Sequence, residues 1–405
     1  MAHKIYLDYA ATTPVDKKVL KAILPYFSEK FGNAMSIHQF GQEALKAVDK
    51  AREQVAEFLK CSPTEIIFTS GATESNNLAI KGALRSYYSR PENKNKKPHI
   101  ITTKFEHHCV LDTCKILEKE ASAEVTYLPV YKEGVVKIED VKKAIKPNTI
   151  LISVMHVNNE IGTVQPIIAI GKLLRELRIR AKELRYPLFH TDATQGVNYF
   201  DCDMTKLNVD LLSFSAHKIY GPKGVGVLFV RKNTPIKRIQ DGGDQEYKLR
   251  AGTHNVPGIV GLGEAISQLT TNNKQQTTKI INLRDYLIQR VIKEIPRSYL
   301  NGSLEKRSPN NANFRFDNVE GEGLVLSLDM EGIAASTGSA CSSGALEPSH
   351  VLLAIGLKPE QAHGSLRLTL GKHTTKKEID FTANKLKEII KRLRSISGKV
   401  LEEFK

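Results

Sequence analysis

One lysine of this sequence lies where a covalent reaction with an aldehyde is chemically reasonable. Lys218 belongs to the polar turn Ser213–Gly224, which separates an apolar run ending at Leu212 from a second apolar run, Val225–Val230. This pattern predicts two buried strands joined by a turn. A lysine that burial deprives of its proton can bond covalently to an aldehyde. The alternative is a solvated turn lysine, which is the commoner case, so Lys218 alone does not decide between them.

Polar residues also follow other predicted strands, and these strands must position them. The predicted strands are 65–69, 99–103, 124–130, 149–157, 188–191 and 211–215, and helical patterns separate most of them. Such alternation predicts parallel βαβ units with helices on both faces, in which ligands lie beyond the carboxyl ends of the strands. Polar groups gather at five of these ends: Thr73, Glu106–His108, Asn158–Glu160, Asp192–Gln195 and Ser215–Lys218. We therefore expect one shared crevice.

The remaining patterns predict an α/β fold with two domains. Residues 15–27 and 37–59 read as helices, the second with Ser36 as its N-cap. A long helix begins near Gly258, after which strands and helices mix; residues 364–370 read as a strand and a basic helix starts near Lys376. We expect a large domain, residues 15–260, with a mostly parallel sheet covered by helices on both faces. A smaller α+β domain is expected from residues 1–14 and 261–405.

Several of the polar groups have two interpretations each. The segment Ser70–Asn77 reads as strand, small-residue turn and helix start, which suits a phosphate, although an ordinary capped helix fits equally well. Asp192 ends an apolar strand and stays ionised there only if it faces a cation, such as a protonated pyridine nitrogen; its alternative is a helix N-cap. Arg367, in an apolar strand, offers a fork for a carboxylate or forms a structural ion pair.

The adjacent histidines His107 and His108 follow a strand, and their spacing does not tell which imidazole points inward. Gln195 is either a donor to a ring oxygen or a polar turn residue. The hydroxyls of Thr73 and Ser215 suit a phosphate but also bond backbone in ordinary turns.

Composition narrows the class of protein. The chain has 405 residues, of which 41% are hydrophobic and 25% charged, as in ordinary globular proteins. No apolar run reaches the roughly 18 residues of a spanning helix, and no signal-like core follows Met1, so we expect no membrane and a cytoplasmic location. The net charge of +15 allows an acidic partner or nucleic acid, but the lysines are scattered over helices, which favours a solvated basic surface.

The five cysteines form no C-x-x-C pair, which argues against a disulfide framework and a zinc site. Four of them read as small buried apolar residues. Cys341 differs, because the run of Ser, Gly and Ala around it, residues 334–344, offers little to pack against. Such a loop suits an exposed, reactive thiol.

Read together, these stretches resemble the cysteine desulfurases of the NifS/IscS type, which are class V aminotransferases within the fold type I pyridoxal-phosphate enzymes. The resemblance covers nearly the whole chain and rests on the following segments: Tyr6–Pro14, Ser70–Asn77, His156–Gly162, His190–Gln195, Ser215–Gly224, Arg250–Thr253, Gly338–Cys341, and Arg367 with Gly371.

The resemblance implies a role for each site residue. Lys218 would carry pyridoxal 5'-phosphate and later move protons, His107 would stack on its ring as acid and base, and Cys341 would take the sulfur of L-cysteine as a persulfide, releasing alanine. The implied cofactor contacts are Ala72, Thr73, Asn158, Asp192, Gln195, Ser215, His217, Lys218 and, from the other subunit of a homodimer, Thr253. Asn158 and Arg367 would position the substrate carboxylate, and no metal is implied. His107 as a base would also make the thiol of Cys341 a thiolate.

Two departures limit what the resemblance implies. Asp244 stands where a third glycine is usual, and either weakens cofactor binding or faces solvent. The C-terminal end, residues 399–405, does not resemble the extension that docks the iron–sulfur scaffold, so a sulfur-acceptor partner is expected without residue-level support. The segment 180–187 is longer than usual and has no assigned function. The alternatives are a selenocysteine lyase or aminotransferase of the same fold, and a basic, non-catalytic scaffold for acidic partners or RNA.

Overall fold

The computed structural model describes residues 4–181, 186–338 and 348–396, and its main feature is a seven-stranded sheet. In spatial order the strands are β2 (Ile66–Thr69), β8 (Gly226–Val230), β7 (Leu211–Ser215), β6 (Leu188–Asp192), β5 (Thr149–Ser153), β3 (His99–Thr103) and β4 (Glu124–Leu128). Only β8 runs against the others, because the short turn after β7 leaves no room for a crossover helix. The predicted mostly parallel sheet is confirmed.

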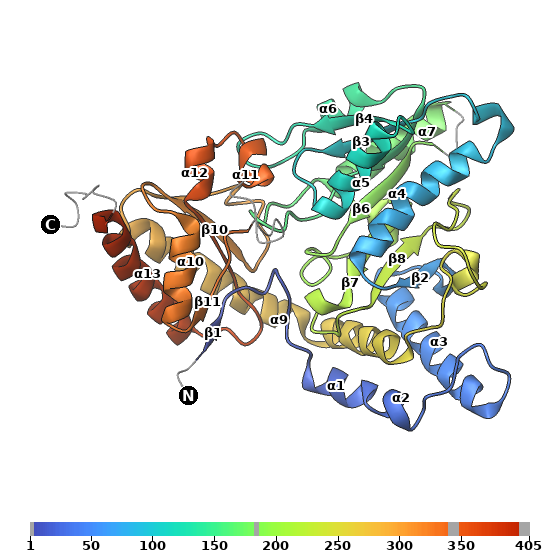
Figure 1. Cartoon of the computed structure of the whole chain (residues 1–405), viewed down its shortest axis with the longest axis horizontal. Coiled ribbons are helices and arrows are strands. Elements are labelled where there is room, and N and C mark those ends of the chain that lie inside the picture. The colour runs from blue at the N-terminus through green and yellow to red at the C-terminus, as the bar shows by residue number, and fades with distance from the viewer. Residues whose placement is uncertain (1–3, 182–185, 339–347, 397–405) are drawn as a thin grey trace.

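Successive residues of the strands point to opposite faces of this sheet, and helices cover both. Ile67 and Ile100 pack in one hydrophobic cluster, whereas their neighbours Phe68 and Ile101 pack in another. Helices α4 (Ala72–Tyr88) and α5 (His108–Lys119) cover one face, as Figure 1 shows, and contribute to the first cluster. The opposite face is covered by helices that include α3 (Gln39–Leu59), α7 (Ile167–Ala181) and the first part of α9 (Val256–Glu294).

A second, smaller body of α+β structure lies at the other end of α9 (Figure 1). Its antiparallel sheet has the order β12 (Ser365–Thr369), β10 (Asn311–Phe316) and β9 (Ser298–Leu300), and β1 (Ile5–Tyr6) pairs with β11 (Ile333–Ala334). Ile5 and Leu7 share a hydrophobic cluster with the helices α10 (Gly321–Met330) and α13 (Lys376–Ile396). The N-terminal segment thus belongs to this body. The predicted boundary at residue 260 falls inside α9, and the exact division into domains stays a prediction.

The remaining α-helices are short and lie between the longer elements. They are α1 (Lys17–Ile23), α2 (Pro25–Ser28), α6 (Ile138–Ala144), α8 (Met204–Leu207), α11 (His350–Ala354) and α12 (Pro359–His363). Among the described residues, no helix has both the length and the apolar character that crossing a membrane requires.

Two local predictions were wrong. The helix expected over residues 15–27 is interrupted at Pro25, whose missing N–H cannot continue the hydrogen bonds of α1 and which instead opens α2. The N-cap of α3 is His38 rather than Ser36, because the His38 imidazole accepts from the Gly41 N–H at 3.3 Å.

Candidate active site

A cavity of about 530 Å³ opens at the carboxyl ends of the parallel strands. Its walls come from both bodies of the chain, with the loop at residues 10–12 and Arg367 contributed by the smaller one. Of the residues proposed from the sequence, it brings together Ala72, Thr73, His107, Asp192, Gln195, Ser215, His217, Lys218 and Arg367. The shared crevice expected from the strand ends is therefore present.

The start of α4 forms one wall of the cavity and is suited to an anion. Gly71, before the first residue of α4, has φ 152° and ψ 177°, a conformation that is essentially restricted to glycine, and no side chain in the described part of the chain caps the helix. The backbone N–H groups of the first turn are therefore left for a ligand. Beside them lies the Ser215 hydroxyl, at 3.7 Å from where a β-carbon on Gly71 would stand.

His217 and Thr73 line the same part of the cavity. Burial lowers the pKa of His217 to about 4, with Lys218 and Lys223 acting in the same direction, so its imidazole is neutral at pH 7. Its Nδ1 lies 3.1 Å from the Thr12 hydroxyl. A neutral ring next to two lysines leaves this end of the cavity positively charged.

Lys218 lies in the 3₁₀ turn Ala216–Lys218 directly after β7. Its ammonium donates to the backbone carbonyl of Ala10 and, at 2.6 Å, to that of Ala11. The N-terminal loop therefore holds the amine at the cavity rather than in bulk solvent, where the alternative interpretation of a solvated lysine would place it. Gln195 donates to the same Ala10 carbonyl at 3.0 Å.

Asp192 is the last residue of β6 and is 5% exposed. Its Oδ2 accepts from the Asn76 amide at 2.7 Å, and its Oδ1 accepts from the Thr194 N–H at 2.9 Å. The bond to Thr194 closes a turn, and residues 193–203 form turns and coil rather than a helix, so the helix N-cap considered in the sequence is not formed. The carboxylate lines the cavity instead.

The structure distinguishes the two adjacent histidines. His107 lines the cavity and caps α5, whereas His108 turns outward, pairs with Asp112 at 3.4 Å and packs against the tilted ring of His350, with 4.7 Å between ring centroids. Burial lowers the pKa of His107, and the nearby Asp192 partly opposes this shift. His107 is thus a neutral imidazole within the cavity.

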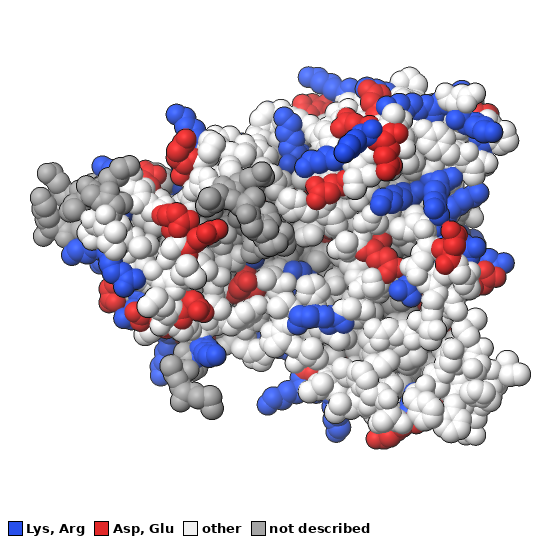
Figure 2. Space-filling model, viewed as in Figure 1, with Lys and Arg blue, Asp and Glu red and all other residues white. Residues whose placement is uncertain are grey.

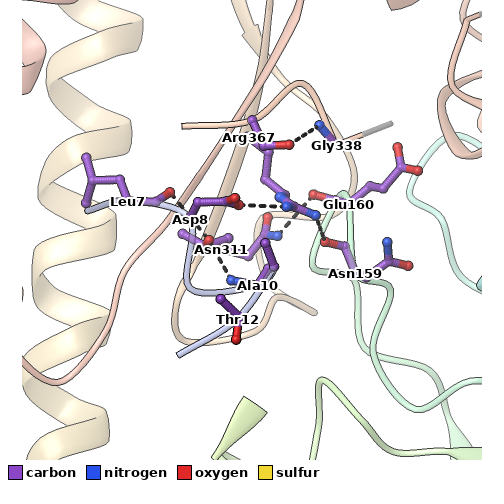
Figure 3. A network of polar contacts seen from close by, with 12 residues as sticks. Leu7, Asp8, Ala10, Thr12, Asn159, Glu160, Asn311, Gly338 and Arg367 are labelled. Atoms are coloured by element: carbon purple, nitrogen blue, oxygen red, sulfur yellow. Dashed lines mark hydrogen bonds and ion pairs between the residues drawn. The ribbon is translucent and has the colours of Figure 1, made fainter. Parts of the chain in front are cut away.

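Arg367 forms the structural ion pair that the sequence offered as its alternative role. One terminal nitrogen of the guanidinium donates to Asp8 at 2.8 Å and the other to the Asn159 carbonyl at 2.8 Å, as Figure 3 shows. The side chain nevertheless lines the cavity, and its Nε is buried without a hydrogen-bond partner among the described residues. A carboxylate in the cavity would meet a guanidinium that Asp8 already orients.

Asn158 occupies a different place from the one the resemblance implied. Its amide donates to the Phe105 carbonyl at 2.9 Å and accepts from the Glu160 and Ile161 N–H groups at 2.9 and 3.0 Å, and the residue is only 1% exposed. The neighbouring Asn159 lines the cavity instead, with its Oδ1 buried and unpartnered within the described chain. The bonds of Asn158 shape the loop that presents Asn159.

Two further residues singled out in the sequence lie outside this cavity, and a third is not among the described residues. Thr253 is exposed at a separate cavity of about 70 Å³, which shares Ser70 and Gly224 with the large one. Asp244 is 64% exposed and lies 3.7 Å from both Arg238 and Lys248, so it faces solvent. Cys341 lies outside the described residues, as do residues 182–185 of the longer segment and the C-terminal residues 397–405.

Sequence reasoning missed Cys109, which it placed among the small buried apolar thiols. Cys109 lines the cavity, with its Sγ 3.0 Å from the Nδ1 of His107. Its position two residues after His107, at the start of a helix that follows a strand end, was the available signal. Cys114 and Cys202, by contrast, are buried in the hydrophobic clusters as predicted.

Comparison with known proteins identifies the relatives of this chain. The family model described as aminotransferase class-V matches residues 5–381. A cysteine desulfurase IscS of Dictyoglomus turgidum is 51% identical over 98% of this chain and 97% of its own length, and that of Methanosarcina thermophila is 47% identical over 99% and 95%. The chain belongs to the class V aminotransferases, on their cysteine desulfurase branch.

Solved structures agree with this assignment. A NifS-like protein superposes with a TM-score of 0.86 at 38% identity, over 96% of this chain and 99% of that one. A structure described as SspA in complex with cysteine gives a TM-score of 0.78 at 40% identity, over 92% and 100%. The family resemblance and the fold class predicted from the sequence are confirmed.

Members of this family depend on pyridoxal phosphate, and the residues of the cavity fit that group. The uncapped start of α4 with Ser215 suits a phosphate, and the Asp192 carboxylate suits a protonated pyridine nitrogen. Lys218 supplies the amine for the aldehyde. When bound, the cofactor supplies an electron sink that weakens the Cα–H bond of an attached amino acid.

Proposed function

We propose that this chain is a pyridoxal-phosphate-dependent cysteine desulfurase, which converts L-cysteine to L-alanine and passes the sulfur to Cys341 as a persulfide. The observation that carries the proposal is the cavity itself, in which Lys218, Asp192 and the open end of α4 surround one space of about 530 Å³. Relatives named cysteine desulfurase at about half identity over nearly the full length support the choice of reaction.

The residues of this chain then divide the work. Lys218 would bond the cofactor through its amine and would carry protons at the cavity from the position that the carbonyls of Ala10 and Ala11 define. Asp192 is held at the ring nitrogen by its bonds to Asn76 and Thr194. Ala72, Thr73, Ser215 and His217 hold the phosphate, and Gln195 bonds a ring oxygen.

The substrate carboxylate lies against Arg367. Asp8 and the Asn159 carbonyl fix the plane of the guanidinium. Its buried Nε and the neighbouring edge of the group are therefore already oriented to bind an anion. We assign the neighbouring polar contact to Asn159, which lines the cavity, with Asn158 supporting the loop. The related structure described as SspA in complex with cysteine supports L-cysteine as the substrate of this chain.

A homodimer is part of the proposal. Six large apolar residues of α1–α3 and their connections are more than half exposed: Leu24 56%, Phe27 65%, Phe31 65%, Met35 54%, Ile37 93% and Phe40 53%. Figure 2 shows few charged side chains over this corner of the molecule, at the lower right. A patch of this kind marks a protein interface. Thr253 is exposed and does not line the large cavity of its own subunit. This position suits a contact with the phosphate bound in the second subunit.

The destination of the sulfur is an acceptor protein of iron–sulfur cluster assembly or of a thiolation pathway. The basic surface suits an acidic acceptor, and no direct contact with nucleic acid is expected. A cytoplasmic location is proposed because the four described cysteines are free thiols, which persist in a reducing compartment.

The proposal is tested by incubating the purified holoenzyme with L-cysteine and a reductant. Equal amounts of alanine and sulfide are expected. Cys341→Ala should stop sulfide release, and Lys218→Ala should remove the visible absorption of bound cofactor as well as the activity. Unchanged sulfide release by Cys341→Ala would point to a selenocysteine lyase, and transfer of the amino group without alanine or sulfide would point to an aminotransferase. A colourless protein that releases no alanine would favour the non-catalytic scaffold.

A further inference from the structure

Cys109 contacts His107 through two atoms of the same residue. Its Sγ lies 3.0 Å from the Nδ1 of His107, and its backbone N–H donates to that same Nδ1 at 3.2 Å. The amide of Asn76 donates to Sγ at 3.0 Å. All of these contacts lie where α5 begins, with His107 as the N-cap. The family resemblance assigns no role to this thiol.

The directions of these hydrogen bonds fix the proton on the imidazole. A backbone N–H can only donate, so Nδ1 must be an acceptor, and a neutral ring then carries its hydrogen on Nε2. The Asn76 NH₂ group can also only donate, so Sγ accepts from it and the S–H remains to be directed at Nδ1. No other assignment lets all three bonds form.

We propose that Cys109 is a positioning residue for His107, whose thiol holds Nδ1 as an acceptor and so leaves Nε2–H as the donor that faces the cavity. The neutral ring carries no other N–H, so His107 offers the cavity a hydrogen bond and not a transferable proton, since loss of Nε2–H would leave an imidazolate. In its resting form it is not the base that makes a thiol a thiolate, which differs from the role expected from the sequence. The substrate side of the ring is therefore the Nε2–H group, which acts as a hydrogen-bond donor while the only lone pair of the ring, on Nδ1, is engaged by the backbone N–H and the thiol of Cys109.

The surroundings of the thiol agree with a donating S–H. Burial raises the pKa of Cys109 to about 12, with Asp192 and Glu106 acting in the same direction, so the thiol keeps its hydrogen at neutral pH. The groups that face His107 are Asp192, which favours the charged imidazole, and Lys218, His108 and His350, which oppose it.

The same contacts connect His107 to the far side of the cavity. Asn76, which is fully buried, donates both to Cys109 and, at 2.7 Å, to Asp192. A hydrogen-bonded chain thus runs from His107 through Cys109 and Asn76 to Asp192. Cys109 is not itself among the residues proposed to contact the cofactor, so its replacement removes none of those residues and leaves the bond between Asn76 and Asp192 in place.

The test measures the tautomer and the pKa of the His107 imidazole by NMR in the cofactor-free protein. Histidines are labelled with ¹⁵N and ¹³C, and the resonances of His107 are identified by their loss in His107→Gln. The wild type should show the Nε2–H tautomer. In Cys109→Ala, which loses one donor to Nδ1, the pKa of His107 should rise by about half a unit. Cys109→Ser should restore the wild-type value, since its hydroxyl also donates.

Cys114→Ala is the matched control, because it removes a thiol from the same helix on its buried core face and should leave the His107 signals unchanged. An Nδ1–H tautomer in the wild type would overturn the proposal without any variant. So would equal His107 pKa values in the wild type, Cys109→Ala and Cys114→Ala. The use of this hydrogen bond in catalysis rests on the proposed function, but the resonances do not, so absent desulfurase activity would refute the function and leave this assignment in place.

Discussion

Replacing Glu246 by glutamine should destabilise the protein by about 3 kcal/mol at neutral pH. The Glu246 carboxylate is 2% exposed and accepts from Arg52 at 2.7 and 2.9 Å, from the Phe68 N–H at 2.7 Å and from His254 at 2.8 Å. Glu246 is also the first of three consecutive residues, ending at Lys248, whose φ angles lie between 46° and 67°. Residues other than glycine rarely adopt this conformation. This carboxylate therefore anchors the loop that carries Thr253.

The magnitude follows from the pKa of Glu246. Burial alone would raise this pKa, but the Arg52 guanidinium and the His254 imidazole more than offset burial and hold it at about 2. An unfolded glutamate titrates near 4.3, so the difference of somewhat more than two units corresponds to about 3 kcal/mol. Because the folded pKa is the lower one, this stabilisation is present above the unfolded pKa and is lost as pH falls from about 4.5 towards 2.

The assay is urea unfolding of the cofactor-free wild type and Glu246→Gln at one protein concentration, at pH 7 and at pH 3. The gap between the two proteins should be large at pH 7 and smaller at pH 3. Glu43→Gln is the control, since Glu43 pairs with Lys30 at 2.8 Å on the surface, with side chains 45% and 42% exposed, and its loss should be small. Equal losses in Glu246→Gln and Glu43→Gln would refute this account of the loop.

Two further substitutions test the cavity. Arg367→Lys should raise the KM for L-cysteine about tenfold or more with a smaller effect on kcat, because an ammonium cannot both keep the bond to Asp8 and offer two donors to the carboxylate. Arg315→Lys on the neighbouring β10 is the control. An unchanged KM in Arg367→Lys would show that Arg367 does not belong to the substrate site. Gly71→Ala should weaken pyridoxal-phosphate binding in titrations of the cofactor-free protein, because φ 152° with ψ 177° costs alanine about 1–3 kcal/mol where α4 meets the phosphate. Gly356→Ala, at φ 91° but remote from the cavity, should lower stability without changing cofactor affinity, and equal affinities of both variants would contradict the proposed phosphate site.

The alternation of strands and helices was sufficient to predict the large sheet, its buried strands and the edge at which the site lies. Residues at strand ends such as Asp192 and Lys218 were found because topology alone brings the ends of parallel strands together. Helix boundaries were less predictable where one residue decides them. Pro25 divides a helical pattern, and His38 caps a helix although serine, two residues earlier, is the commoner cap.

The orientation of side chains within the site was not predictable from spacing. Asn158 and Asn159 are adjacent amides, and only the folded loop turns the first to backbone groups and the second to the cavity. His107 and His108 differ in the same way. Cys109 escaped notice because its position two residues after His107 does not show by itself how close the two side chains lie, and its role depends on the distance from Sγ to the Nδ1 of His107, the residue that caps this helix.

The central claim is that sulfur leaves L-cysteine in this cavity and arrives at Cys341. The most direct measurement mixes the holoenzyme with a slight excess of L-cysteine in the absence of reductant, quenches the mixture by alkylation and maps the modified peptides by mass spectrometry. We predict one alanine per subunit and one added sulfur atom on Cys341, with Cys109 unmodified. Alanine formed without added sulfur on Cys341, or added sulfur on another cysteine when Cys341 is intact, would contradict the account.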